Sequence, residues 1–196
     1  MPKVSKYPQS LPLEQFAIWR DGFTADEIEQ IIFLESLQSF EKGVVGSESK
    51  KNLEARDSDI QWIHPDQNSA WIFDKFSEII SHVNRDHFML DIDGFDAFQL
   101  TKYEEDQHYS WHWDYEFGYR TWVRKISCVM LLSDPEEYEG GEFEICLNGN
   151  FTKTNVIKPK KGDIIFFASW MPHRVLPVTS GERRSLVAWV MGKREC

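Results

Sequence analysis

The first part of the chain carries apolar residues at helical spacing. Thr24 and Glu27 form a T-x-x-E capping box, and the apolar residues behind it predict a helix over about 25–39. A second helix is predicted to start near Ser69, because the apolar residues of 71–83 fall on one helical face. Each helix therefore presents an apolar stripe that must pack against another element.

After residue 94 the period changes to that of β-strands. Short apolar or alternating stretches are separated by turn signals, and NGN (148–150) and KKGD (160–163) are predicted hairpin turns. This order favours an α+β, mainly β fold: a double-stranded β-helix (jelly roll) core with the N-terminal helices packed on one sheet. The stretches are FDAFQLTKY, ISCVMLL, GEFEICL, TNVIKP, DIIFFA, HRVLPV and SLVAWVM.

No internal repeat or domain-scale linker interrupts the pattern. We therefore expect a single domain over 1–196, with a helical N-terminal part over about 13–93 and a jelly-roll core over about 94–192. Two stretches lack periodicity. Residues 1–12 carry Pro and Ser and are predicted to be irregular, and the polar segment 41–59, with its Gly and Ser residues, is predicted to be a mobile loop.

Charge and cysteine usage restrict the cellular setting. The formal net charge of -10, with acids clustered after residue 133, argues against broad binding of a nucleic-acid backbone. Three cysteines lie far apart without a C-x-x-C pair, which is typical of reduced thiols in the cytosol. The N-terminal stretch has no apolar h-region, and no window approaches the about 18 apolar residues of a membrane helix. We expect a cytoplasmic protein without a membrane segment.

The stretch YSWHWDYEFGYR places His112 and Asp114 two residues apart in an aromatic setting. On a strand these side chains project from the same face, about 7 Å apart along the backbone, and could supply two adjacent metal ligands. The alternative is a half-buried strand whose polar residues face water. A metal site needs a third ligand from elsewhere in the chain. The other histidines are His64, His82, His87, His108 and His173.

His173 stands out among them because it begins a strand after GDIIFFASWMP. Farther along, GERRSL places Arg183 and Ser185 on one strand face, and a guanidinium with a hydroxyl is a natural receptor for a carboxylate. Two histidines and one carboxylate leave the remaining positions of an octahedral ion open, the facial arrangement of non-heme Fe(II) oxygenases.

The order of these motifs resembles that of the Fe(II)/2-oxoglutarate-dependent oxygenases. Tyr103, Tyr109, His112 and Asp114 are followed by LSDPEEYEGGEFEI, KPKKGDIIFF and PHRVLPVTSGERRSLVAW. The resemblance covers about 95–191 and is greatest to the prolyl 4-hydroxylase-like branch and the bacterial PKHD-type hydroxylases. ARDSDIQWI is also similar to the R-x-S segment of prolyl hydroxylases.

The resemblance implies a role for each residue of the core site. His112, Asp114 and His173 would hold Fe(II). Arg183, helped by Ser185, would pair with the distal carboxylate of 2-oxoglutarate. Tyr103 would lie beside this cosubstrate.

The resemblance also implies that Arg56 and Ser58 lie near a substrate cleft and Trp189 near the metal, and Trp113 is a further candidate for the substrate wall. Residues 41–60 combine Gly, Ser and charge with few apolar anchors, so we expect a lid that orders when substrate binds. Trp113 is equally compatible with a core position. One departure lies in LLSD, where prolyl hydroxylases often carry Tyr and this chain has Leu131. PKHD-type proteins accept an apolar residue there, which favours that branch.

The implied reaction is hydroxylation of a prolyl residue in a peptide or protein partner, with O2 as cosubstrate, decarboxylation of 2-oxoglutarate to succinate, and ascorbate as a candidate reductant. Another substrate is an alternative: a free amino acid, a lysyl residue or a nucleobase, the last disfavoured by the acidic charge. A jelly roll that binds metal without turnover is a second alternative. Metal-dependent hydrolysis is a third, disfavoured because hydrolysis has no need of Arg183.

Overall fold

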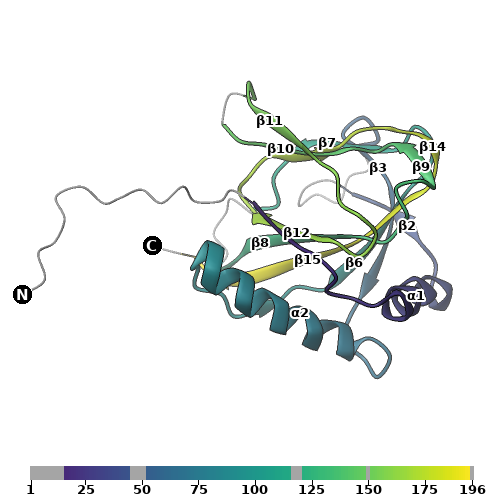
Figure 1. Ribbon diagram of the computed structural model, residues 1–196. Helices are drawn as coiled ribbons and strands as arrows, with labels where there is room; N and C mark the ends of the chain where they lie inside the picture. Colours follow the sequence, from purple (N-terminus) through teal and green to yellow (C-terminus); the bar gives the residue numbers. More distant parts are fainter. Residues whose placement is uncertain (1–15, 45–51, 116–120, 149–150, 195–196) are drawn as a thin grey trace, which may run out of the picture.

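The computed structural model describes residues 16–44, 52–115, 121–148 and 151–194. Residues 1–12, predicted to be irregular, lie outside this part of the chain. Two β-sheets face each other, and the helices cover the outer side of the larger sheet (Figure 1). No helix in the four described ranges has the length and apolar character needed to span a bilayer.

The larger sheet has eight strands, and its antiparallel pairings place β8 and β15 at its centre. Its order is β1-β12-β8-β15-β6-β4-β2, and β5 pairs with β15. The strands are β1 (Phe16–Trp19), β2 (Glu41–Lys42), β4 (Asp59–Ile63), β5 (Gly94–Phe95), β6 (Phe98–Tyr103), β8 (Trp122–Leu131), β12 (Ile164–Ala168) and β15 (Arg183–Lys193).

The smaller sheet has five strands in the order β11-β10-β13-β7-β3, and a further two-stranded sheet pairs β14 with β9. The double-sheet jelly roll predicted from the strand pattern is thereby confirmed. The strands are β3 (Arg56–Asp57), β7 (His108–His112), β9 (Tyr138–Gly140), β10 (Phe143–Cys146), β11 (Thr154–Ile157), β13 (His173–Val175) and β14 (Val178–Gly181).

Both predicted helices are present. α1 (Ala25–Phe33) begins at the expected capping box, in which the Glu27 amide donates to Thr24 Oγ1 at 3.3 Å and the Thr24 amide donates to Glu27 Oε2 at 2.7 Å. It continues into a 3₁₀ turn, η1 (Leu34–Leu37). α2 (Ala70–Val83) follows Ser69 and continues into a π-helical turn, η2 (Asn84–Phe88).

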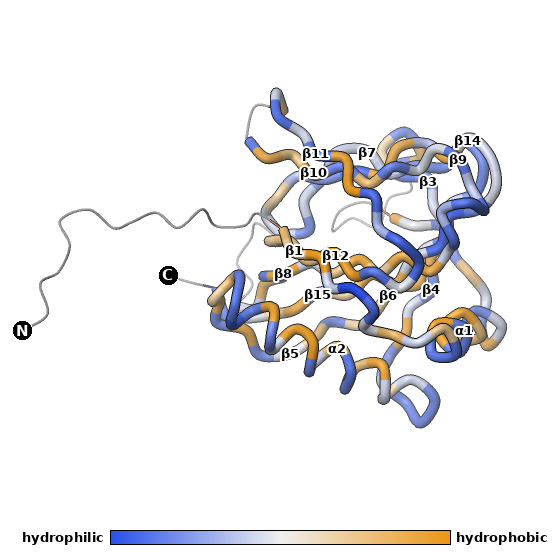
Figure 2. Tube along the Cα trace, in the orientation of Figure 1, coloured by the Kyte–Doolittle hydropathy of each residue, from blue (hydrophilic) through white to orange (hydrophobic). Residues whose placement is uncertain are grey.

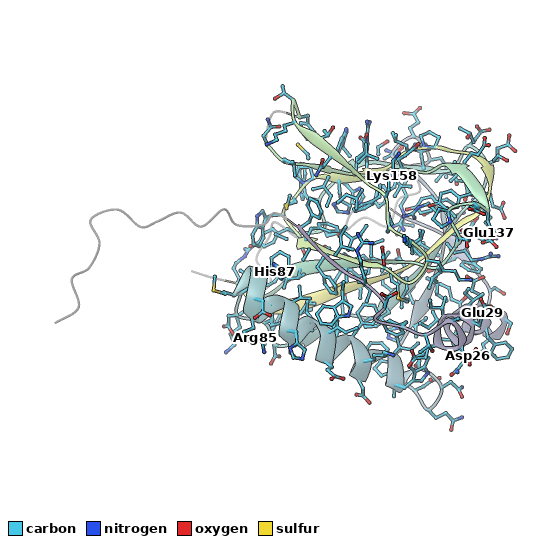
Figure 3. The ribbon with its side chains drawn as sticks, viewed as in Figure 1. Asp26, Glu29, Arg85, His87, Glu137 and Lys158 are labelled. Carbon is cyan, nitrogen blue, oxygen red and sulfur yellow. The ribbon has the colours of Figure 1, made fainter. Side chains whose placement is uncertain are left out.

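Strand alternation divides the apolar residues between two cores. Apolar positions recur along β12 and along α2 (Figure 2). On β12, Phe166 packs with the helices, whereas its neighbour Phe167 packs between the two sheets. On β15, Leu186 and Ala188 likewise lie under the helices, and Val187 contacts the core between the sheets. Side chains that point to the same side as Phe167 and Val187 therefore line the interior of the jelly roll. Acidic side chains such as Asp26, Glu29 and Glu137 are exposed on the outside (Figure 3).

The N-terminal part is less purely helical than the sequence pattern indicates, because it also supplies β1, β2, β3 and β4 to the sheets. The first two residues of the expected mobile loop and part of its end are therefore strand. Residues 45–51 of that segment lie outside the described residues, but Arg56 and Ser58 are buried on the last part of it. The prediction fails there because the inward-facing side chains of this stretch are polar, so no apolar alternation marks it as a strand.

The two predicted hairpin turns have different outcomes. β10 and β11 form the hairpin expected around NGN, although residues 149 and 150 lie outside the described part. KKGD does form a turn, with Gly162 at φ +86°, but it connects β11 of the smaller sheet to β12 of the larger one. It is therefore not a hairpin. The local turn signal is the same in both cases, and only the sheet that the next strand joins distinguishes them.

Candidate metal centre

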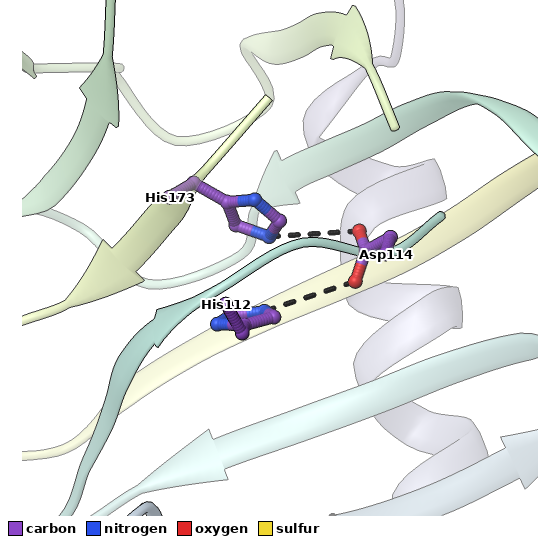
Figure 4. Close-up of side chains that lie close together, drawn as sticks. All are labelled: His112, Asp114 and His173. Carbon is purple, nitrogen blue, oxygen red and sulfur yellow. Dashed lines mark ion pairs between the residues drawn. The ribbon is translucent and has the colours of Figure 1, made fainter. Parts of the chain in front are cut away.

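One strand pairing brings the predicted metal ligands together. His112 ends β7, His173 begins β13, and the two residues are register partners in the smaller sheet. Asp114 follows β7 and lies between them, with Oδ1 3.7 Å from His112 Nε2 and Oδ2 3.5 Å from His173 Nε2 (Figure 4). The three ligand atoms lie within 4.8 Å of one another, and no other such group occurs among the described residues.

Backbone carbonyls orient both imidazole rings. His112 Nδ1 lies 2.9 Å from the Ser110 carbonyl, and His173 Nδ1 lies 3.0 Å from that of Met171. Because a carbonyl only accepts, each Nδ1 must carry the proton and donate it. In a neutral ring with this tautomer, Nε2 carries the lone pair, and both Nε2 atoms lie on the side of Asp114. This is the tautomer that a metal-binding histidine requires.

A pair of serines holds the carboxylate. Ser127 Oγ donates to Asp114 Oδ2 at 2.7 Å and lies 3.0 Å from Ser169 Oγ. The Asp114 amide also donates to the Ser169 carbonyl at 2.9 Å. Ser127 belongs to β8 and Ser169 follows β12, so the larger sheet positions a ligand that comes from the smaller one.

The charge states suit a divalent cation. Burial, followed by the charge of His173, lowers the pKa of His112 to about 3, so its imidazole is neutral near pH 7. Burial disfavours the Asp114 carboxylate, but His173 and His112 outweigh it, and the pKa lies below its usual range. Two imidazole nitrogen donors and one carboxylate oxygen donor match the ligand set of a non-heme Fe(II) site.

Arg183 places a positive charge in the same interior, with no carboxylate partner among the described residues. Its side chain is 1% exposed, and its position on β15 has the inward parity of Val187. Its Nη1 donates to Ser185 Oγ at 3.4 Å, and its Nε has no hydrogen-bond partner in the described part of the chain. A buried, unpaired guanidinium is costly, so this position fits an anionic ligand that arrives from outside the chain.

Tyr103 on β6 and Leu131 on β8 lie on the two strands that flank the start of β15. Tyr103 is the register partner of Arg183, with its ring centroid 5.8 Å from the guanidinium carbon. Burial raises the pKa of Tyr103, so its hydroxyl stays protonated. Leu131 is the residue at which this chain departs from the prolyl hydroxylase pattern. It is fully buried opposite Ser185, so the interior is apolar at this position. Tyr103, Arg183 and Ser185 therefore gather as the resemblance implies.

The predicted substrate residues are more dispersed. Trp189 is buried with its ring centroid 5.9 Å from that of Trp62 and 3.8 Å from the guanidinium carbon of Arg124, and its Nε1 has no partner among the described residues. Trp113 is 51% exposed, so it is not a core residue. Trp62 and Arg124 are additions to the site. Arg124 belongs to no sequence motif. Trp62 could have been found from the alternation of side chains along β4, which directs it to the interior.

Arg56 and Ser58 lie inside the molecule, not on an exposed lid. Arg56 Nε donates to Ser58 Oγ and its Nη2 donates to Gln99 Oε1, each at 2.8 Å. The Arg56 guanidinium also lies 4.6 Å from the ring centroid of Tyr109. Burial is the main cause that raises the pKa of Tyr109 to about 12, so this residue is a neutral phenol.

Comparison with known proteins agrees with this geometry. Residues 98–191 match the family model described as the 2OG-Fe(II) oxygenase superfamily. A PKHD-type hydroxylase of Janthinobacterium sp. (strain Marseille) is 36% identical over 96 residues, which cover 46% of this chain and 41% of that protein. One from Parvibaculum lavamentivorans is 36% identical over 91 residues, covering 46% and 40%. The chain thus spans less than half the length of these relatives.

Solved structures share the fold over nearly the whole chain. A Pseudomonas putida prolyl-4-hydroxylase superposes with a TM-score of 0.71 at 20% identity, covering 93% of this chain and 94% of that one. A Trichoplax adhaerens prolyl hydroxylase, solved with a hypoxia inducible factor peptide fragment, gives 0.73 at 19%, covering 90% and 83%.

The residues present fit the two groups that the family model names. The histidines and the carboxylate match Fe(II), and the unpaired Arg183 matches a dicarboxylate such as 2-oxoglutarate. Motif order, fold and ligand set agree with the PKHD-type and prolyl hydroxylase branch. Over residues 98–191, the chain is therefore similar to the 2OG-Fe(II) oxygenase superfamily.

Proposed function

We propose that the chain is an Fe(II)- and 2-oxoglutarate-dependent dioxygenase that hydroxylates a prolyl residue in a peptide or protein. The observation that carries this proposal is the buried guanidinium of Arg183, whose Nε is unpaired and which lies in the same interior as the His112–Asp114–His173 cluster. A metal site together with an anion site is what a cosubstrate-dependent oxygenase needs.

His112, Asp114 and His173 would hold the iron, and the chain's own contacts keep them ready for it. The carbonyls behind both Nδ1 atoms fix the imidazole tautomers, and Ser127 holds one oxygen of Asp114. When bound, Fe(II) with 2-oxoglutarate and O2 supplies an oxidation that couples formation of succinate to hydroxylation of the substrate.

Arg183 and Ser185 would bind the distal carboxylate of 2-oxoglutarate. A charge-assisted bond in this buried position would compensate a cation that has no carboxylate partner among the described residues. A module that only holds metal, or a metal-dependent hydrolase, gives no reason to bury such a cation. The anion site therefore favours the oxygenase over both alternatives.

The prolyl substrate is supported by the relatives and by the aromatic wall. Two of the superposed structures are titled as prolyl hydroxylases. In this chain, Trp62 and Trp189 pack against each other in the interior, and Arg124 covers the Trp189 ring. An apolar aromatic wall suits a compact, uncharged ring such as that of proline.

The test is formation of succinate from 2-oxoglutarate with Fe(II), with and without ascorbate. Peptides that contain proline are compared with the same peptides carrying alanine, with lysine peptides and with free L-proline. We expect proline peptides to raise succinate formation and to gain one oxygen atom by mass spectrometry. Stimulation by the lysine peptides or by free proline alone would contradict the prolyl assignment. Failure to form succinate with any substrate, and to bind 2-oxoglutarate, would contradict the oxygenase.

A further inference from the structure

Three planar side chains of the smaller sheet, those of Arg56, Tyr109 and the metal ligand His112, form a stack. The Tyr109 and His112 rings are nearly parallel, with centroids 3.4 Å apart and planes inclined by 10°. On the other side, the Arg56 guanidinium lies 4.6 Å from the Tyr109 centroid. Arg56 and Tyr109 are register partners of β3 and β7, so the strand pairing builds this contact.

The outer end of the stack is held by neutral groups of the larger sheet. Arg56 donates to Ser58 Oγ and Gln99 Oε1, and Thr101 Oγ1 donates to the same Gln99 oxygen at 3.2 Å. Arg56 is 8% exposed and has no carboxylate partner in the described ranges. Because these bonds fix the plane of the guanidinium, they also fix the ring that packs on it.

A glycine leaves room for this arrangement. A Cβ at position 43 would lie 2.6 Å from Arg56 Nε and 2.7 Å from Ser58 Oγ, both far too close for a non-bonded contact. The Gly43 amide also donates to the Ser58 carbonyl at 2.8 Å, which holds the backbone in that position. A side chain at Gly43 would therefore displace Arg56 without touching Tyr109 or His112.

The stack restrains the His112 ring further than its hydrogen bond does. Within the described ranges, the ring's one hydrogen bond runs from Nδ1 to the Ser110 carbonyl, and a single bond of this kind still allows the ring to tilt about it. A parallel aromatic face on one side restricts that tilt. The groups that orient a metal-binding histidine typically contribute tenfold to a hundredfold to metal affinity.

We propose that Tyr109, clamped by Arg56, is a positioning residue that fixes the ring plane of His112 for metal binding. The inference rests on the metal site of the proposed function and adds two residues to it. It also gives Arg56 a role through Tyr109, in place of the substrate contact expected from the sequence. Neither Arg56 nor Tyr109 would touch the metal.

Replacing Arg56 should affect metal affinity in opposite directions through its charge and through its geometry. A buried cation near the site repels a divalent ion, so removal of the charge alone would strengthen metal binding. Loss of the planar clamp would weaken it. Arg56→Lys separates the two effects, because it retains the charge but loses the planar fork that stacks on Tyr109 and bonds to Gln99.

The experiment is a titration of the full chain with Co(II), followed by its visible absorption spectrum. The variants are Tyr109→Phe, Tyr109→Leu, Arg56→Lys and Gly43→Ala. The matched control is Arg174→Lys, because Arg174 lies 4.6 Å from the Trp111 ring centroid in the same sheet but contacts Glu144 and not a metal ligand. Thermal unfolding of each metal-free protein establishes that it is folded.

We expect Tyr109→Phe and Arg174→Lys to bind Co(II) like the wild type. Tyr109→Leu, Arg56→Lys and Gly43→Ala should bind about tenfold more weakly, with an altered spectrum. Wild-type affinity in Arg56→Lys and Tyr109→Leu overturns the positioning role. If Arg56→Lys or Tyr109→Leu does not fold, the Co(II) affinity of Gly43→Ala is used instead. Wild-type affinity in that variant overturns the positioning role. Absence of Co(II) binding by the wild type contradicts the metal site itself, and so is distinct from failure of this inference.

Discussion

His112 and His173 face each other across the β7–β13 pair, with ring centroids 4.1 Å apart. The two residues are distant in sequence, yet one antiparallel register brings both Nε2 atoms to the same carboxylate. The candidate metal site therefore depends on the strand pairing that brings the two histidines together. Changes at the ligands should remove metal binding while leaving the fold in place.

The first prediction concerns the ligands. His112→Ala and Asp114→Ala should each abolish binding of one Mn(II), Co(II) or Ni(II) ion per chain, because each removes one of three protein donors. Titration calorimetry measures the loss, and circular dichroism confirms the fold. Unchanged affinity in both variants would show that the cluster is not the metal site.

The second prediction concerns the serine behind Asp114. Ser127→Ala removes the donor to Asp114 Oδ2, so the carboxylate loses its fixed orientation and metal affinity should fall by about tenfold. Ser133→Ala is the matched control, because Ser133 is also a buried serine with a bonded hydroxyl but lies against Glu182 and Arg184. Calorimetry with Mn(II) compares the two. Equal losses would mean that Ser127 acts only through stability.

The third prediction concerns the glycine beneath Arg183. Gly141 has φ +63°, and a Cβ there would lie 3.0 Å from Arg183 Cδ. Gly141→Ala should cost about 1–3 kcal/mol of unfolding free energy through backbone strain. It should also weaken 2-oxoglutarate binding by displacing the guanidinium. Denaturant unfolding and calorimetry test the two effects separately, and metal affinity should not change.

The glycine at the KKGD turn provides the comparison. Gly162 has φ +86°, and a Cβ at this position would meet only the flexible end of Ile28 at close range. Gly162→Ala should cost a similar amount of stability but leave 2-oxoglutarate affinity unchanged. If both variants lose cosubstrate affinity equally, the loss comes from destabilisation and not from the contact with Arg183.

Much of this architecture can be predicted from the sequence because local and global signals agree. The capping box of Thr24 and Glu27 and the apolar face of α2 each have a local physical cause. The ligand set is equally accessible, because two ligands sit on one strand end and the third begins another. Motif order then distinguishes the site from a chance His-x-Asp.

The remaining parts depend on tertiary contacts. β3 and the start of β4 escape detection because Arg56 and Ser58 face inwards, where apolar residues are expected. Arg124 belongs to no motif and becomes part of the site only by lying 3.8 Å over Trp189. Tyr109 lies within the motif, but its role depends on the pairing with Arg56. Sequence spacing contains none of these contacts.

We propose that the interior between the two sheets holds both a metal site and the anion site of Arg183. Arg183→Ala would leave the cosubstrate carboxylate buried and unpaired, at a cost of about 3–5 kcal/mol, which is about two to four decades in affinity. Arg183→Lys should recover part of this loss, because it retains the charge but not the fork. Neither change removes a metal ligand.

The most direct measurement is therefore 2-oxoglutarate affinity and succinate formation in the wild type, Arg183→Ala and Arg183→Lys, with the metal content of each determined. The account predicts that Arg183→Ala retains full metal content but loses 2-oxoglutarate binding and turnover, with Arg183→Lys intermediate. Wild-type turnover of 2-oxoglutarate by metal-loaded Arg183→Ala would contradict it.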